Sequence, residues 1–121
     1  MLKHYVEFLY PGFFCSGISV EEIDERDAKK VKVPDNCYAF RFFDMTVTVV
    51  DGEILRGDRK NESGYYYYQA EKMTLEQVKT TFGNDWNYRN LISYMETYGY
   101  KEAIKTRFGY VKELNDNDIV L

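Results

Sequence analysis

The chain has 121 residues, a formal net charge of -4 and a single histidine. This length suits one domain, 1–121, and such a domain buries about two-thirds of its unfolded surface without needing a metal or a disulfide. The acidic balance speaks against a DNA- or RNA-binding protein, which normally carries a basic face.

Alternating residue character predicts strands through the first part of the chain. Lys3–Tyr10 alternates and ends at a proline-glycine turn, and Phe13–Ile23 holds a second, less regular strand. Cys37–Val50 carries the strongest strand pattern. The Asp-Gly pair that follows predicts a hairpin into Glu53–Arg56. Gly57–Gly64 is polar and rich in turn residues, which predicts a flexible surface loop.

The second part of the chain mixes strands and helices. Tyr65–Gln69 reads as a strand. Thr74–Gln77 matches a capping box, which predicts a helix to about Phe82 that stops at the next glycine. A second apolar stripe at helical spacing follows, and it consists of Leu91, Tyr94, Met95 and Tyr98, with Gly99 as its cap.

A strand of period two is predicted after that cap, ending in Arg107, and Asp118–Leu121 reads as a short closing strand. The order of elements predicts an α+β domain, a largely antiparallel sheet with two short helices on one side. A polar strip on the second helix (Asn90, Ser93 and Thr97) and the cations of the following strand can meet around one anion, and the sequence leaves open whether they do.

The usual catalytic groups are sparse. His4 has no cluster of cysteines or carboxylates at metal-ligand spacing, so no metal site and no cofactor are predicted. No phosphate-binding loop, dinucleotide fingerprint or nucleophile elbow occurs. Cys15 and Cys37 have only this histidine as a base, and we expect two reduced thiols in a cytoplasmic protein. No signal peptide or membrane span is predicted.

Aromatic residues are in excess instead. They make up 17% of the chain, with 12 tyrosines, so some rings must lie on the surface. Arginine forks bind phosphate and aromatic faces stack on purines. The candidate cations near glycine or aromatic residues are Arg41, Arg56, Arg59, Lys60, Arg89, Lys105 and Arg107. Each of them also has an ordinary alternative role as a solvated or cross-strand-paired charge.

Several plain patterns together resemble one known family. They are YVEF and YPG near the start, FRFFD at Phe40–Asp44, the tyrosine run followed by MTLEQVK, and LIS-x-ME, GY and KTR-x-G in 91–109. The chain resembles the phage Thoeris anti-defence sponges of the first type over nearly its whole length. The resemblance implies a non-catalytic protein that captures cyclic ADP-ribose isomers made by bacterial TIR-domain proteins and so blocks immune signalling in the host cytoplasm.

The resemblance also implies a site and an assembly. The ligand-binding residues would be Phe82, stacking on adenine, Asn90 near the second helix, and Arg107 and Arg56 on the phosphates. Homodimers or higher homo-oligomers are implied, with separate sites for cyclic oligonucleotides in some members. DNA, RNA and membranes are not expected partners.

Two other functions stay open on the sequence. A small phage adaptor could bind a host protein through the four tyrosines and the edge strands. A degradative nucleotide hydrolase would need a pair of carboxylates or a metal site that the spacing does not mark.

Overall fold

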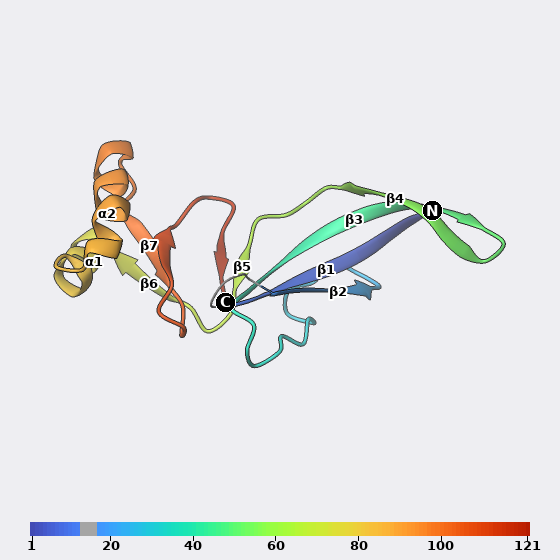
Figure 1. Ribbon diagram of the computed structural model, residues 1–121, viewed down its shortest axis with the longest axis horizontal. Coiled ribbons are helices and arrows are strands. Elements are labelled where there is room, and N and C mark those ends of the chain that lie inside the picture. The colour runs from blue at the N-terminus through green and yellow to red at the C-terminus, as the bar shows by residue number, and fades with distance from the viewer. Residues whose placement is uncertain (13–16) are drawn as a thin grey trace.

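The computed structural model describes residues 1–12 and 17–121, with the backbone alone at 54–56. The described elements are β1 (Leu2–Tyr10), β2 (Gly17–Ile23), β3 (Ala39–Val50), β4 (Glu53–Lys60), β5 (Tyr66–Tyr67), β6 (Glu71–Thr74), α1 (Leu75–Phe82), α2 (Trp86–Tyr98), β7 (Glu102–Lys105), β8 (Val111–Glu113) and β9 (Ile119–Val120). The predicted α+β class, with mostly antiparallel sheets, is confirmed. The molecule is elongated, and both helices lie at one end (Figure 1).

The large sheet is organised around β3. Its order is β2-β1-β3-β5-β9, with β4 also paired to β3, and of the described strand pairs in this sheet only β5–β9 is parallel. The predicted hairpin joins β3 to β4: Asp51 and Gly52 both have positive φ, 51° and 81°, as a two-residue turn of this type requires. This hairpin projects from the end of the molecule opposite the helices (Figure 1).

The face of the large sheet that carries Val6, Phe8, Phe40 and Phe42 is covered by the segment between β2 and β3. Apolar residues of that segment, Ala28, Val31 and Val33, pack against these buried rings, and Cys37 is buried with them. Alternation along β1 and β3 therefore produces a core on this face because every second side chain points the same way.

The predicted loop at Gly57–Gly64 is wrong in its first half, because β4 continues to Lys60. The register of β4 runs from Glu53 opposite Val50 to Lys60 opposite Asp44. Gly57 lies opposite Val47, and a β-carbon there would overlap the side chain of Met45. This glycine therefore allows close packing within a strand rather than flexibility in a loop.

The helices pack on a separate three-stranded sheet of order β6-β7-β8. The predicted capping box of Thr74 and Gln77 is present, and α1 ends at Phe82. Gly99, with φ 77°, caps α2 in the left-handed conformation, as predicted. Buried Val78, Met95 and Ala103 form the core between the helices and this sheet.

Strand β7 joins the two sheets because both of its faces are covered. Ala103 faces the helices, whereas Ile104 packs with Ala39 and Tyr67 of the large sheet, and all of these side chains are buried. The rings of Tyr38 and Tyr110 stack with their centroids 5.2 Å apart beside this contact. Strand β7 thus contributes one buried residue to the core cluster under the helices and another to a cluster at the large sheet.

Two other predicted boundaries change, and a third cannot be compared. The strand expected at Tyr65–Gln69 shrinks to β5, and Gln69 takes a positive φ of 52°. The strand expected to reach Arg107 ends at Lys105, so Arg107 lies in the turn that follows. The start of the strand predicted at Phe13–Ile23, which includes Cys15, lies outside the described residues.

Candidate functional site

Phe82 closes α1 and is half-buried. Its ring packs against the cluster around Val78 and Met95, and it meets the ring of Tyr88, the third residue of α2, at a centroid distance of 4.5 Å and an angle of 37°. The family resemblance implies a ligand platform at this position. The structure gives Phe82 a core contact and leaves part of the ring accessible.

Tyr88 connects Phe82 to the turn that follows β7. Its hydroxyl donates a hydrogen bond to the carbonyl oxygen of Gly109, 2.8 Å away. The turn is closed by the amide of Gly109 donating to Thr106 O at 3.0 Å and by the amide of Phe108 donating to the Thr106 hydroxyl at 3.3 Å. Because Thr106 is itself buried, the turn has a fixed position relative to α2.

Arg107 sits at the exposed side of this turn. Its guanidinium donates to the side-chain oxygen of Gln69 at 2.7 Å and lies 4.8 Å from the centroid of the Phe108 ring. Neither partner carries a charge. These contacts orient the guanidinium of Arg107 but do not neutralise its positive charge, and such a group is suited to bind an anion.

Two other candidate cations have carboxylate partners. Arg41 and Arg59 both donate to Glu7, at 2.6 and 3.2 Å, and Arg59 also lies 4.0 Å from the centroid of Phe43. Burial disfavours the charge on Glu7, but the hydrogen bonds and positive charges of the two arginines outweigh it, and the pKa of Glu7 is lowered. We assign this cluster a structural role.

A second buried carboxylate, Asp44, lies at the other face of the large sheet. It accepts hydrogen bonds from His4 at 2.7 Å, from Arg26 at 3.0 Å and from the amide of Asn61 at 3.0 Å. The hydrogen bond from Asn61 is the largest cause of its lowered pKa, followed by that from His4. The single histidine and another arginine are thus engaged in holding the chain after β4.

Asn90 is not brought to Phe82 and Arg107 within one chain. It is exposed on α2, two residues after Tyr88, which is just over half a helical turn. Since Tyr88 faces Gly109, Asn90 points to the other side of the helix. The meeting of the polar strip with the cations of β7, which the sequence left open, does not occur within a single chain: the apolar layer of Met95 and Ala103 separates them.

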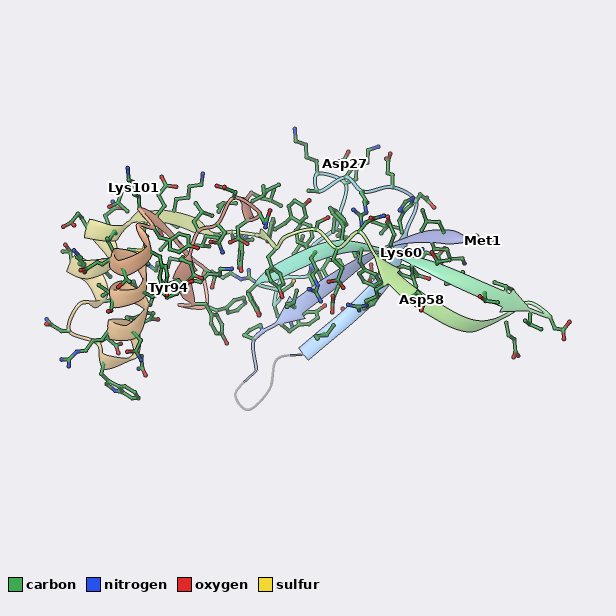
Figure 2. All side chains as sticks on the ribbon, turned by 90° about the horizontal axis from the view of Figure 1, so that it is seen from above. Met1, Asp27, Asp58, Lys60, Tyr94 and Lys101 are labelled. Atoms are coloured by element: carbon green, nitrogen blue, oxygen red, sulfur yellow. The ribbon has the colours of Figure 1, made fainter. Side chains whose placement is uncertain are left out.

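Arg56 is also remote from the other candidate residues. Its backbone pairs with Thr48 in the β3–β4 hairpin. Figure 2 places Asp58, two residues further along β4, toward the end of the molecule opposite Tyr94 of α2. Of the four candidate ligand residues, one chain joins only Phe82 and Arg107, through Tyr88.

Sequence reasoning missed Tyr88 and Gln69. Tyr88 could have been found, since Tyr88, Leu91 and Met95 continue the apolar stripe of α2 by one turn at spacings of three and four. Gln69 carried no such pattern. Its side chain reaches Arg107 because the chain bends after β5, and the bend appears only in the folded structure.

Groups for covalent or metal chemistry are not gathered in the part of the chain that the structure describes. No cluster of three or more histidine, cysteine or carboxylate side chains suited to a metal occurs there. Cys37 is a free, fully buried thiol whose sulfur donates to Ala39 O, and burial raises its pKa. A thiol of this kind is a poor nucleophile.

Comparison of the chain with protein-family models, with curated proteins and with solved structures finds no match. Among the described residues, no helix has both the length and the apolar character needed to span a membrane.

Proposed function

We propose that this protein binds and sequesters a cyclic ADP-ribose-type signalling nucleotide without chemical change, as a phage anti-defence protein acting in the host cytoplasm. The observation that carries the proposal is the link from Phe82 through Tyr88 to the turn of Arg107. It connects a ring that can stack on a purine to a guanidinium whose only polar partner among the described residues is a neutral amide.

The affinity that sequestration requires indicates that one chain does not form the whole binding site. A base stack is worth about 1–3 kcal/mol, and a charge-assisted hydrogen bond about 1.5–3 kcal/mol. Nanomolar sequestration needs about 12 kcal/mol after the cost of lost motion. Phe82 and Arg107 alone fall short of this figure. We therefore place the protein in a homodimer or higher homo-oligomer, in which Asn90 and Arg56 of another copy complete the contacts.

A depletion assay tests the proposal. Purified protein is mixed with a cyclic ADP-ribose isomer, the free ligand is separated by ultrafiltration, and the protein is then heated to release what it holds. We expect the free nucleotide to disappear and to return with its mass intact. Return of a cleaved product would favour a hydrolase, and no depletion would exclude sequestration of that nucleotide.

A second candidate function is the binding of a host protein. The structure favours a different binding surface for it than the four consecutive tyrosines. The four tyrosines are packed: Tyr67 is buried, and Tyr66 stacks on Phe40 at 5.2 Å. The two most exposed rings among the described residues lie on α2 instead, at Trp86 (75% exposed) and Tyr98 (68%). Co-migration of a host protein that is lost in Trp86→Ala, with no effect of nucleotides on the melting temperature, would favour this function.

A further inference from the structure

A groove runs between α1 and α2 on the outer side of the helical unit. Its volume is about 290 Å³, and its lining residues are Lys79, Gly83, Arg89, Ile92, Ser93 and Glu96. Ile92 packs against the core cluster and gives the groove an apolar floor. Gly83 directly follows Phe82 in the chain, so one end of the groove lies at the end of α1.

Arg89 differs from the other arginines whose side chains the structure describes. Arg26, Arg41 and Arg59 bind carboxylates, and Arg107 binds an amide oxygen. The side chain of Arg89 makes no hydrogen bond, ion pair or ring contact with any described residue, and it is exposed. Its five donors are therefore free to bind a ligand.

The lining of the groove holds more cations than carboxylates. Lys79 is paired with Glu96 at 3.2 Å and with Glu76, outside the groove lining, at 3.5 Å. Two cations thus face one carboxylate in the lining, although the whole chain carries a net charge of -4. The hydroxyl of Ser93, one helical turn beyond Arg89, has no partner among the described residues and adds a donor on the same side of α2.

We infer that this groove binds a phosphate group, with the Arg89 guanidinium as its main anchor and the Ser93 hydroxyl as a second donor. The inference rests on the proposed function for its ligand class, a phosphorylated nucleotide, and it adds a phosphate contact on α2 beside Asn90, which lies one helical turn before Ser93. A guanidinium grips two phosphate oxygens at once, whereas a lysine offers a point charge. Arg89 therefore supplies a phosphate contact within the same chain as Phe82.

The test compares three variants by calorimetry with a cyclic ADP-ribose isomer and by NMR titration with inorganic pyrophosphate. Arg89→Ala removes the anchor, Arg89→Lys keeps the charge but loses the fork, and Lys72→Ala removes an exposed, unpartnered cation of β6 as the matched control. We expect affinity to fall roughly 10- to 100-fold in Arg89→Ala. Arg89→Lys should be intermediate, and Lys72→Ala should stay within about twofold. Unchanged thermal melting should show that the fold is intact.

The outcomes separate this inference from the proposed function. Nucleotide binding that is equal in wild type and Arg89→Ala overturns the role of the groove and leaves sequestration standing. Pyrophosphate shifts at Arg89 and Ser93 without nucleotide binding support the groove and overturn the nucleotide proposal. Equal losses in Arg89→Ala and Lys72→Ala would show a general charge effect and would also overturn the inference. No binding of either probe overturns both.

Discussion

The hydroxyl of Tyr88 lies 2.8 Å from the carbonyl oxygen of Gly109, and this contact ties the start of α2 to the turn that carries Arg107. Both ends of the contact are otherwise well fixed. The Tyr88 ring packs on Phe82, and the turn is anchored by buried Thr106. One hydroxyl therefore sets the relation between the proposed stacking ring and the proposed phosphate ligand.

Tyr88→Phe is expected to weaken nucleotide binding severalfold while the fold persists. The ring contact with Phe82 stays, and only the hydrogen bond is lost, at a cost of about 0.5–1.5 kcal/mol in the free energy of unfolding. Calorimetry and urea unfolding measure the two effects. Tyr98→Phe, on an exposed ring of the same helix, is the matched control and should change neither. An affinity in Tyr88→Phe equal to that of wild type would show that nucleotide binding does not depend on the hydrogen bond between Tyr88 and Gly109.

Arg107→Ala is expected to weaken nucleotide binding by about 1.5–3 kcal/mol, the value of a hydrogen bond to a charged group. The side chain is exposed and, in the part of the chain that the structure describes, its one polar partner is Gln69, so the melting temperature should hardly move. Lys29→Ala, an exposed cation between β2 and β3, controls for net charge. An affinity equal to that of wild type would remove Arg107 from the site.

Local chemistry made the hairpin, the capping box and the glycine cap of α2 predictable. Asp51-Gly52, Thr74 with Gln77, and Gly99 each act through their own backbone or a neighbour within four residues, and each is found where it was expected. The α+β class followed from the order of such elements.

Contacts between distant residues decided what the sequence did not reveal. Strand β4 extends into a segment rich in turn residues because Arg59 and Asn61 are held by Glu7 and Asp44, which belong to β1 and β3. Arg107 lies beyond the end of β7, and here too a residue distant in the chain is involved: Tyr88 of α2 fixes the turn that contains Arg107. Grouping Arg56 and Asn90 with Phe82 rested on the family resemblance alone, and one chain does not bring them together.

Glu7→Gln is expected to lower the free energy of unfolding by about 2–4 kcal/mol. The substitution removes the buried carboxylate that Arg41 and Arg59 share. Because both guanidinium groups reach water, the cost is smaller than that of breaking a fully buried ion pair. Urea unfolding measures it. Glu62→Gln, which removes an exposed partner of the same arginines, should cost less than about 0.5 kcal/mol. Equal effects of the two variants would contradict the role of Glu7 as the carboxylate that holds both arginines.

Stability should fall in acid through Glu7 and Asp44. The pKa of each is lowered in the folded protein from its ordinary value, 4.5 for Glu7 and 3.8 for Asp44. The unfolded chain then binds more protons than the folded one in the acid range, so the stabilisation is complete above these ordinary values and is lost as the pH drops through the lowered ones. Urea midpoints measured from pH 7 to pH 2 should decline from about pH 4.5 downward. The decline should be shallower in Glu7→Gln, because that variant has one coupled carboxylate fewer; an identical slope in the two proteins would mean that other groups govern the acid transition.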